Sequence, residues 1–339
     1  MKAAVLTQGG HLSVEEIEEP AADGWAVLQT SAAGLCGTEL HFLDEMLKPP
    51  HYPFVLGHEI AGFVVEAPPE SGIGAGDRVA VYNFVGCRGC HWCTTGRPEL
   101  CRSPLGQLGF SLDGGFSDLV RVPVENLVLL PDNVSFETAA VLACSGMSAV
   151  HATRLAGVGI GSTAVVNGVG GVGLSVVQVA RAAGARVIAI ADAESKADLA
   201  RGLGAADAIV FEQGRGYDEL GDRMRALTRG EGADFYFDLV GTAETMLAGV
   251  RALGRAGCLV IIGYTGDDLV VSSVDLILSE IRIVTSLAAA RHDLETAVRL
   301  AADGRLTVHV DTRYPLSEVA TALERLRARQ VHGRNVLVW

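Results

Sequence analysis

Four cysteines lie within one short segment of the chain, at Cys87, Cys90, Cys93 and Cys101. Spacers of two, two and seven residues separate them in GCRGCHWCTTGRPELC. Four thiolates this close in sequence can surround one tetrahedral Zn²⁺ at Zn–S distances of about 2.3 Å, so one loop can supply every ligand. Two disulfides or an iron–sulfur cluster are alternative interpretations of the same loop. We predict a structural zinc site, because a closed ring of four thiolates leaves no position open for chemistry.

A second metal site is suggested by two of the three remaining cysteines. Cys36 lies in GLCGTELH, Cys144 lies in VLACSGMSAVHA, and His58 lies in a GHE segment between them. Two thiolates and one imidazole would leave the fourth position of a zinc ion open for water or substrate, which is typical of a catalytic site. Taken singly, each residue has a simpler interpretation, since a lone cysteine is usually a small buried side chain and a lone histidine a hydrogen-bonded core residue.

A glycine-rich motif lies near the middle of the chain. Gly168, Gly170 and Gly173 form G-x-G-x-x-G, and the same GVGGVG segment contains Gly171 and Val172. Such glycines permit a tight turn, let the backbone approach a pyrophosphate, and allow the following helix to pack on the preceding strand. The amino-terminal end of that helix then faces the phosphates. The motif is weak alone, but its position between an apolar strand and a helix predicts a dinucleotide site.

Asp192 and Lys196 extend the predicted dinucleotide site. Asp192 closes the second apolar strand, 19 residues after Gly173, close to the offset of a ribose-binding carboxylate. A carboxylate there accepts hydrogen bonds from both ribose hydroxyls and repels a 2′-phosphate, which favours NAD over NADP. The simpler interpretation is that Asp192 caps the next turn. Lys196 follows in that turn and is predicted to contact the adenosine ribose, with a solvated lysine as the alternative.

Two kinds of element must position these residues. Short alternating segments up to about residue 130 (25–30, 62–66, 78–82 and 116–122) are separated by turns and predict a mostly antiparallel β domain. A helix should begin near Ser135, which is a suitable N-cap. From about residue 147, buried apolar strands alternate with helices, which is the mark of a parallel, doubly wound sheet. The last fifty or so residues predict two helices and a strand that close back onto the first domain.

Composition limits the class of protein. The chain has 339 residues, 49% of them hydrophobic, 41 glycines and a net charge of −13. This length and composition predict a two-domain globular α/β protein, and the negative charge argues against a nucleic-acid or anionic-membrane partner. Neither a secretory leader nor a membrane-spanning run is evident, so we expect a cytoplasmic protein whose clustered cysteines bind metal.

These motifs together resemble the zinc-containing medium-chain alcohol dehydrogenases. The resemblance is carried by GLCGTELH, GHEIAGFVVE, the four-cysteine loop, LACSGMSAVHA, GVGGVG with Asp192, and the terminal GRNVL, which are six matches in order over nearly the full length. It implies a GroES-like β-barrel catalytic domain over residues 1–146, a Rossmann NAD-binding domain over 147–285, and a return of 286–339 to the catalytic domain. It also implies two zinc ions per chain, NAD, and an alcohol that is interconverted with its aldehyde or ketone.

The resemblance also assigns roles by position. It makes Cys36, His58 and Cys144 the catalytic zinc ligands, and Glu59 a carboxylate behind the metal. It implies that Thr38 bonds the substrate alcohol and that His41 takes the proton toward solvent. It makes Arg334 a contact of the pyrophosphate, and it places the backbone near Val240, Ile262 and Gly263 in the nicotinamide pocket.

Three departures from the family pattern leave alternatives open. Gly37 stands where some relatives have a basic residue, and Glu39 stands where the family usually has Asp as partner of the ligand histidine. A cysteine such as Cys144 is the third zinc ligand typical of alcohol dehydrogenases, whereas the CGTEL segment is more similar to that of the polyol and threonine dehydrogenases. A zinc-independent enoyl or quinone reductase and a non-catalytic binding protein are further alternatives. The apolar Phe42, Leu43, Met46 and Leu47 favour a hydrophobic or aromatic alcohol, and family habit suggests a homodimer or homotetramer joined near residues 265–285.

Overall fold

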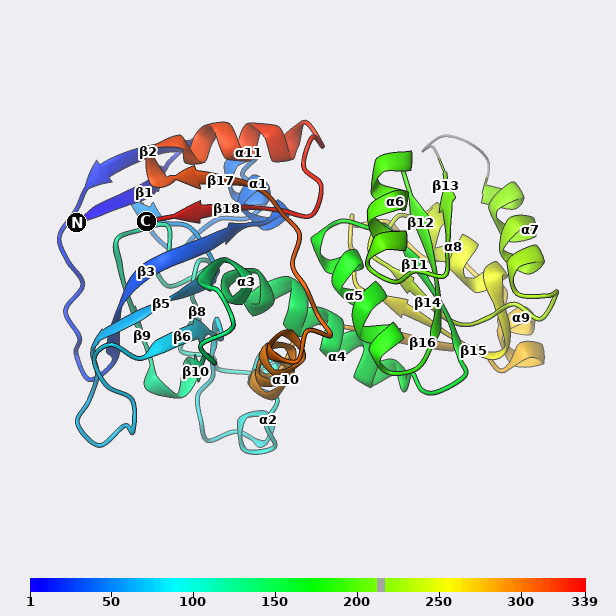
Figure 1. The fold of residues 1–339 in the computed structure, drawn as a ribbon, viewed down its shortest axis with the longest axis horizontal. Coiled ribbons are helices and arrows are strands. Elements are labelled where there is room, and N and C mark those ends of the chain that lie inside the picture. The colour runs from blue at the N-terminus through cyan, green and yellow to red at the C-terminus, as the bar shows by residue number, and fades with distance from the viewer. Residues whose placement is uncertain (212–216) are drawn as a thin grey trace. The chain divides into compact units, whose positions relative to one another are not determined.

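The computed structural model describes residues 1–211 and 217–339, which form two compact units (Figure 1). The first unit contains Met1–Met147, Ala290–Gly304 and Val308–Trp339. The second unit contains Ser148–Ala289 and Arg305–Thr307. The first unit is therefore assembled from both ends of the chain, and the second is formed mainly by the middle.

The first unit is built from β-sheets. Its main described sheet has the order β10-β6-β5-β3-β18-β17, with β9 also paired to β3, and smaller sheets have the orders β2-β1-β4 and β7-β8. All of these pairs are antiparallel except β17 with β18. The strands are β1 (Lys2–Thr7), β2 (His11–Glu16), β3 (Ala26–Leu35), β4 (Phe54–Val55), β5 (Glu59–Glu66), β6 (Arg78–Val81), β7 (Phe84–Val85), β8 (Gly106–Gln107), β9 (Leu119–Val122), β10 (Leu127–Leu129), β17 (Val310–Pro315) and β18 (Arg334–Val338).

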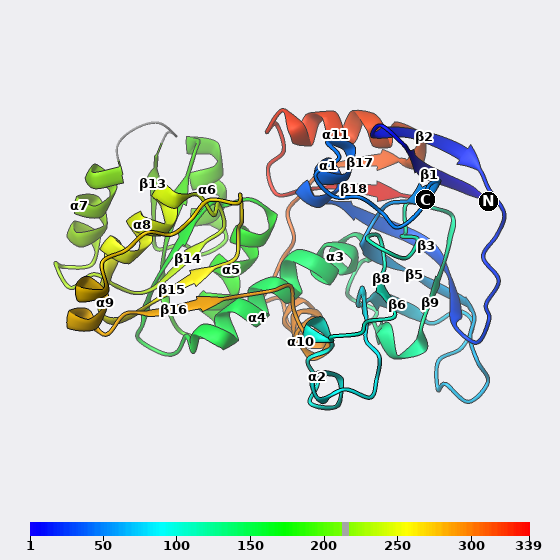
Figure 2. The ribbon, with the colours of Figure 1, turned by 180° about the vertical axis from the view of Figure 1, so that it is seen from behind.

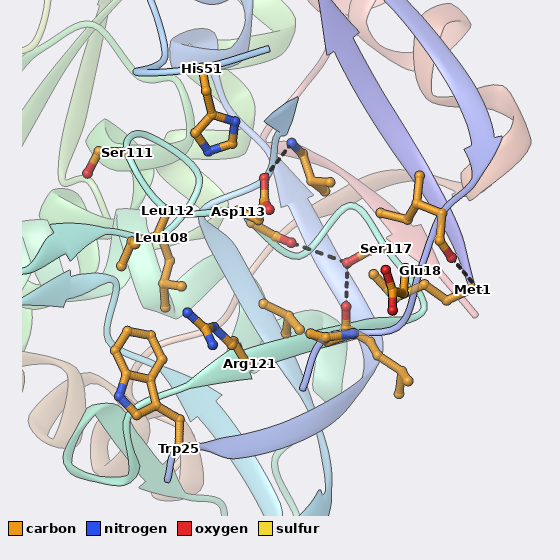
Figure 3. A pocket seen from close by; sticks show the side chains of 16 residues that line it. Met1, Glu18, Trp25, His51, Leu108, Ser111, Leu112, Asp113, Ser117 and Arg121 are labelled. Carbon is orange, nitrogen blue, oxygen red and sulfur yellow. Dashed lines mark hydrogen bonds between the residues drawn. The ribbon is translucent and has the colours of Figure 1, made fainter. Parts of the chain in front are cut away.

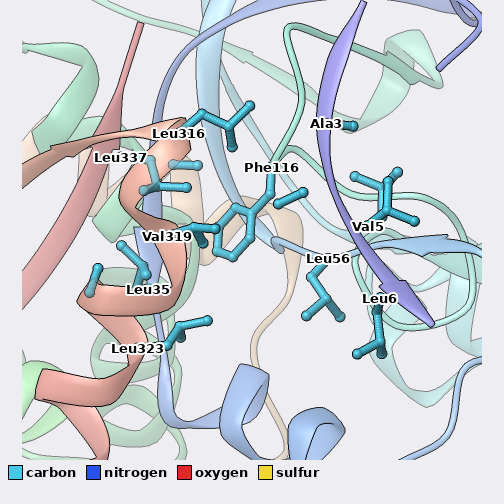
Figure 4. Packing of buried hydrophobic residues seen from close by; sticks show 14 of the residues in the cluster. Ala3, Val5, Leu6, Leu35, Leu56, Phe116, Leu316, Val319, Leu323 and Leu337 are labelled. Atoms are coloured by element: carbon cyan, nitrogen blue, oxygen red, sulfur yellow. The ribbon is translucent and has the colours of Figure 1, made fainter. Parts of the chain in front are cut away.

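The carboxyl-terminal segment completes the core of the first unit. Strand β18 pairs antiparallel with β3, with Asn335 opposite Leu35, and in both views β17, β18 and α11 lie beside β1 (Figure 1, Figure 2). Figure 4 shows Phe116 among side chains from both ends of the chain. The apolar side chains of this terminal segment share one buried cluster with those of the amino-terminal segment, which is why the two ends fold as one unit. The labelled members of the cluster are Ala3, Val5, Leu6, Leu35, Leu56, Phe116, Leu316, Val319, Leu323 and Leu337.

Short helices connect and flank these strands. The predicted N-cap at Ser135 is present, since the Thr138 amide donates to Ser135 Oγ at 3.2 Å. Helix α3 runs directly into a π-helical turn, η3, after which α4 begins. The helical segments are α1 (Gly37–Leu43), α2 (His91–Thr94), η1 (Pro98–Leu100), η2 (Val124–Asn126), α3 (Phe136–Val141), η3 (Leu142–Gly146), α10 (Arg291–Ala302), η4 (Leu316–Glu318) and α11 (Val319–Arg327), with α4 (Met147–Ala156) beginning at the unit boundary.

The second unit has a parallel sheet of order β13-β12-β11-β14-β15-β16. Helices α5 and α6 lie in front of this sheet in Figure 1 and α8 lies in front of it in Figure 2, so both faces are covered. This strand order is that of the Rossmann fold, and the predicted fold class is confirmed. The elements are β11 (Thr163–Asn167), α5 (Gly171–Ala182), β12 (Arg186–Ala191), α6 (Glu194–Gly202), β13 (Asp207–Val210), α7 (Tyr217–Leu227), β14 (Ala233–Asp238), α8 (Ala243–Ala252), β15 (Leu253–Ile261), α9 (Ser273–Ser279) and β16 (Arg282–Thr285).

Several elements differ from the sequence prediction. The strand expected over 116–122 begins only at Leu119, because Phe116 is fully buried in the core cluster at a turn before the strand. The carboxyl-terminal segment contains an additional strand, β17. None of the helices in the described part of the chain is long and apolar enough to cross a membrane.

Candidate metal centres and dinucleotide site

The four-cysteine loop brings its four sulfur atoms together. All four Sγ atoms lie within 4.8 Å of one another. The Sγ atoms of Cys87 and Cys93 are 3.9 Å apart, and those of Cys90 and Cys101 are 3.8 Å apart. Thiolates about 2.3 Å from a tetrahedral zinc are about 3.8 Å from each other, whereas a disulfide would hold two sulfurs at about 2.05 Å. The spacing therefore fits a zinc ion and not two disulfides.

Short local elements hold this loop. Cys90 is the N-cap of α2, Cys93 lies within α2, and Cys101 follows η1. Backbone amides of Cys87 and Cys90 donate to the sulfurs of Cys101 and Cys87, each at 3.4 Å. Donors aimed at sulfur stabilise thiolates, and the Cys93 amide lowers the pKa of the Cys90 thiol to about 6. The backbone donors thus favour the charged forms of Cys87 and Cys90, whereas burial raises the pKa of the Cys93 thiol to about 12.

The second cluster gathers residues from distant segments. Ligand atoms of Cys36, His58, Glu59 and Cys144 all lie within 4.8 Å of one another. Cys36 follows β3 and is the N-cap of α1, and Cys144 lies in the π-helical turn η3. His58 and Glu59 stand at the start of β5. Two thiols, an imidazole and a carboxylate converging at one point are a donor set that suits zinc.

The side chains of this cluster shift one another's pKa values. A hydrogen bond from Cys144 lowers the pKa of the Cys36 thiol well below its usual value, and burial opposes that effect. Burial disfavours the charged form of His58, yet the Glu39 carboxylate and Cys36 raise its pKa well above the usual value. The close approach of Glu39 and Cys36 thus favours positive charge at His58, the charge that a metal ion would supply when bound.

Glu39 orients His58. His58 Nδ1 lies 2.7 Å from Glu39 Oε1, and both side chains are buried. The Cys36 amide donates to the other oxygen of the same carboxylate at 2.8 Å. The extra methylene of Glu39 relative to Asp therefore does not prevent the bond, and Nδ1 is occupied so that Nε2 is left to face the cluster.

Glu59 lies behind the ligands and is paired with Arg334. Arg334 Nη2 lies 2.9 Å from Glu59 Oε1, and both side chains are buried. The contact lacks the alignment of a hydrogen bond, since neither carboxylate oxygen of Glu59 has a hydrogen-bond partner among the described residues. Gly34 lies opposite Glu59 across β3 and β5, and a Cβ atom there would be 1.8 Å from Glu59 Oε2. The absence of a side chain at Gly34 makes room for the carboxylate.

Two further predicted residues lie on α1, beside the cluster. Thr38 Oγ1 lies 3.7 Å from Cys36 Sγ, and His41 follows one turn later. Phe42, from the same helix, is buried in the core cluster, and Leu43 and Leu47 pack against that cluster. Core packing therefore accounts for the apolar character of these three residues, while Met46 is exposed to solvent.

The glycine motif of the second unit opens a cleft at the carboxyl ends of β11 and β12. Gly168 has a φ of +95°, and a Cβ at Gly173 would lie 1.9 Å from the Gly168 carbonyl oxygen. Both positions therefore require glycine, for the turn and for helix packing. The cleft is lined by Asn167, Gly168, Val169, Gly170, Ile190, Ala191, Asp192, Lys196, Phe211 and Val240.

Asp192 and Lys196 lie together in this cleft. Lys196 Nζ is 2.9 and 3.0 Å from the two carboxylate oxygens of Asp192. Gly171 and Val172 form the first turn of α5 after Gly170, its N-cap. Ile262 and Gly263 follow β15, at the same end of the sheet as Val240. The predicted dinucleotide residues of this unit therefore gather at the carboxyl edge of the sheet.

Sequence reasoning missed three residues that support these sites. They are Gly34, Phe110, whose ring centroid lies 5.2 Å from that of His58, and Asp238 at the end of β14. Another pocket, of about 250 Å³, lies in the first unit beside Trp25, Arg121 and Ser117 (Figure 3). Among the described residues that line this pocket, none is a predicted site residue.

Comparisons with known proteins agree with the two units. A family model described as "Alcohol dehydrogenase GroES-like domain" matches residues 22–132, and one described as "Zinc-binding dehydrogenase" matches residues 171–303. An NAD-dependent alcohol dehydrogenase of Saccharolobus solfataricus is 32% identical over 354 residues, covering 100% of both chains. An acryloyl-coenzyme A reductase of Metallosphaera sedula is 31% identical over 350 residues, covering 99% of both.

A solved structure supports the same family assignment. The alcohol dehydrogenase of Aeropyrum pernix has a TM-score of 0.90 at 31% identity, with 100% of both chains covered. The family resemblance predicted from the motifs is confirmed by these full-length matches. The chain belongs to the zinc-binding dehydrogenase family and is an oxidoreductase with an alcohol dehydrogenase GroES-like domain.

Proposed function

We propose that this protein is a zinc- and NAD-dependent alcohol dehydrogenase that interconverts a primary or secondary alcohol with its aldehyde or ketone. The observation that carries the proposal is the convergence of Cys36, His58 and Cys144, with Glu59, within 4.8 Å in one cluster whose cysteines are half-buried. Three ligands plus a displaceable carboxylate leave a coordination position for a substrate oxygen. The alcohol dehydrogenase relatives of similar length support the same reaction.

Each cluster would hold one zinc ion, and the two ions would have different tasks. The four-thiolate site is closed, so its ion would stiffen the loop from Cys87 to Cys101 and take no part in chemistry. The ion held by Cys36, His58 and Cys144 would supply Lewis acidity at the substrate oxygen, and NAD would accept the hydride.

Side chains of this chain would transfer the proton of the substrate hydroxyl. Thr38 Oγ1, close to Cys36 Sγ, can accept a hydrogen bond from the substrate hydroxyl and pass the proton onward. His41 is one turn further along α1, and an imidazole can take up a proton near neutral pH. Glu39 would keep His58 in the orientation that presents Nε2 to the metal.

The cofactor preference is assigned to Asp192. Its carboxylate lies at the edge of the cleft that begins with Gly168, where it can accept hydrogen bonds from ribose hydroxyls. Lys196 holds the carboxylate in place through both of its oxygens. A 2′-phosphate at this position would meet the negative charge of Asp192, which favours NAD over NADP. Arg334, which the sequence assigns to the pyrophosphate, remains a proposed cofactor contact.

We also infer a homo-oligomer formed through the second unit. Ile277 and Leu278 of α9 are 72% and 73% exposed, and Val270 and Val274 nearby are exposed as well. The described sheet ends at β16, so the outer edge of that strand is unpaired. An exposed apolar patch beside an open strand edge marks an interface, and a second copy of the chain is the proposed occupant.

Metal analysis combined with an activity assay tests the proposal. We expect the purified protein to contain about two zinc ions per chain, and to reduce NAD with an alcohol. Cys36→Ser and His58→Ala should each retain the four-cysteine zinc and lose turnover. Cys258→Ser is the matched control, because Cys258 is buried in β15 and belongs to neither cluster. Turnover retained in both site variants would overturn the proposal.

A second candidate function is reduction of an activated carbon–carbon double bond. It is favoured by the full-length similarity to an acryloyl-coenzyme A reductase. A substrate panel distinguishes the two: short, long, aromatic and polyol alcohols with NAD, against an enoyl thioester with NADH. Faster turnover of the enoyl thioester would favour the reductase, and a preference for polyols would favour the polyol dehydrogenase alternative.

A further inference from the structure

Asp238 is a buried carboxylate that the proposed chemistry does not use. It is the last residue of β14, and its side chain is fully buried. The strands on either side are β11, which ends in Asn167, and β15, which ends in Ile261. Asp238 therefore lies at the carboxyl edge of the sheet, where ligands bind in open α/β folds.

Its side chain receives four hydrogen bonds. Oδ1 accepts from the amides of Val240 and Gly241 at 3.0 and 3.3 Å, and from Asn167 Nδ2 at 3.3 Å. Oδ2 accepts from Thr245 Oγ1 at 2.7 Å. A carboxylate suits this position because it has two acceptor oxygens and no donor. Burial raises the pKa of this carboxyl, and the four donors oppose that effect.

The backbone of the same residue holds a second segment. The amides of Ile262 and Gly263 both donate to the Asp238 carbonyl oxygen at 3.0 Å. The two segments also touch directly, since a Cβ at Gly241 would lie 2.3 Å from the Gly263 carbonyl oxygen. Asp238 thus ties the loop after β14 to the loop after β15 and, through Asn167, to the start of the glycine motif.

We infer that Asp238 is a positioning residue for the nicotinamide half of the cofactor, an inference that depends on the proposed NAD-linked function. Val240, Ile262 and Gly263 are the backbone positions assigned to the nicotinamide pocket, and Asp238 bonds all three. The adenosine half is assigned to Asp192 and Lys196, at the end of β12. In the described part of the chain, Asp238 forms neither a hydrogen bond nor an ion pair with Asp192 or Lys196. Loss of its carboxylate should therefore weaken binding of the nicotinamide half more than binding of the adenosine half, although Asn167 and Val240 also line the cleft of Asp192.

Binding of NAD and of ADP-ribose, which lacks nicotinamide, tests this inference by calorimetry. In Asp238→Ala, buried amides lose their acceptor, and we expect NAD to bind roughly tenfold more weakly while ADP-ribose affinity changes by less than about twofold. Asp238→Asn should bind NAD within about threefold of wild type, because its amide oxygen can replace Oδ1 and its NH₂ can donate to Thr245. Thr245→Val removes the Oδ2 bond and the local bonds of Thr245 Oγ1 to Thr242, keeps all three Oδ1 bonds, and should leave the ratio of the two affinities unchanged.

Hydrogen exchange of the ligand-free protein is an independent readout. Asp238→Ala should speed exchange at the amides of Val240 and Gly241, whereas Asp238→Asn should protect them nearly as well as wild type. If Asp238→Ala does not fold, Asp238→Ser is measured by the same criteria. Its single hydroxyl can replace only part of the acceptor set, so NAD should again be weakened more than ADP-ribose.

The outcomes separate this inference from the proposed function. Equal weakening of NAD and ADP-ribose, unchanged NAD binding in Asp238→Ala, or an equally large effect of Thr245→Val would overturn the positioning role alone. A wild-type protein that binds neither ligand would overturn the proposed NAD-linked function, and the inference with it. Selective weakening of NAD, rescued by Asp238→Asn, supports both.

Discussion

A single polar contact fixes the orientation of His58 at the proposed metal site. Its Nδ1 is 2.7 Å from Glu39 Oε1, and both side chains are buried. A carboxylate bonded to one ring nitrogen fixes the ring orientation and makes the other nitrogen a better ligand. Because Glu39 also accepts from the Cys36 amide, it orders two of the three proposed ligands.

Replacement of Glu39 should weaken one zinc site and spare the other. For Glu39→Gln we expect about 10-fold to about 100-fold lower zinc affinity at the site of Cys36, His58 and Cys144, because the ligand loses its charged partner. Competition with a chromogenic chelator measures this loss, and the four-cysteine zinc of the same molecule is an internal control. Glu39→Asp should behave more like wild type. Equal zinc affinity in Glu39→Gln and wild type would contradict the assigned role.

Glu59 should make the stability of the metal-free protein depend on pH. Burial raises the pKa of this carboxyl to about 8, although Arg334 is beside it. The folded protein therefore favours the protonated form, and its stabilising effect is present at low pH and is lost as the pH rises through about 8. Between about pH 6 and about pH 9, the unfolding temperature of zinc-stripped wild type should fall more than that of Glu59→Gln. Parallel profiles in the two proteins would show that Glu59 does not titrate in this range.

At the scale of elements, strand β3 and the turn η3 bring the ligands together. β3 pairs with β5 so that Gly34 is opposite Glu59, and it ends one residue before Cys36. Cys144 is reached through a π-helical turn between α3 and α4, and such bulges occur often at functional sites. The geometry of the cluster thus depends on a missing side chain in β3 and on one irregular helical turn.

A methyl group at Gly34 should disrupt this arrangement. In Gly34→Ala the new Cβ would be 1.8 Å from Glu59 Oε2, so the carboxylate must move. We expect a loss of about 1–3 kcal/mol in unfolding free energy, as for other overpacked cores, and a lower zinc content. Denaturant unfolding and metal analysis measure the two effects.

Gly37→Ala is the control for that substitution. A Cβ at Gly37 meets nothing within 4 Å, although the residue is only three positions away in the sequence. The stability and zinc content of the Gly37→Ala variant should match those of wild type. If Gly34→Ala behaves like Gly37→Ala, the close approach of Gly34 and Glu59 does not constrain the site.

At the scale of the whole molecule, the ends of the chain share one core while an apolar patch of the middle is left open. Leu316, Val319 and Leu323 pack with Val5 and Leu6 in one cluster (Figure 4). By contrast, Ile277 and Leu278 on α9 are exposed beside the edge strand β16. Buried apolar area stabilises the first unit internally, whereas the patch on the second unit is available to another chain.

Charge on that patch should break the proposed oligomer. We expect the double variant Ile277→Glu with Leu278→Glu to be smaller in solution than wild type, because two carboxylates would have to be buried in the interface. Light scattering coupled to size-exclusion chromatography measures the mass. Ile160→Glu is the matched control, since Ile160 is 96% exposed and lies outside the patch. A wild-type protein that is already monomeric would contradict the proposal.

The sequence alone was sufficient where the determinants are local. Cys87, Cys90 and Cys93 predict their zinc site because a short loop cannot carry them far apart. Gly168 and Gly173 predict the dinucleotide turn for the same reason, and the alternation of apolar strands and helices predicts the parallel sheet, which is confirmed. Local spacing limits the possible geometry before the chain folds.

The tertiary structure alone decided what depends on contacts between distant segments. No spacing indicates that Gly34 must leave room for Glu59, that Asp238 joins two loops, or that Phe42 belongs to the core. The cluster of Cys36, His58 and Cys144 was inferred from family motifs, but its convergence within 4.8 Å exists only when β3, β5 and η3 are packed together. Residue types determine which chemistry is possible, and long-range packing determines which side chains meet to perform it.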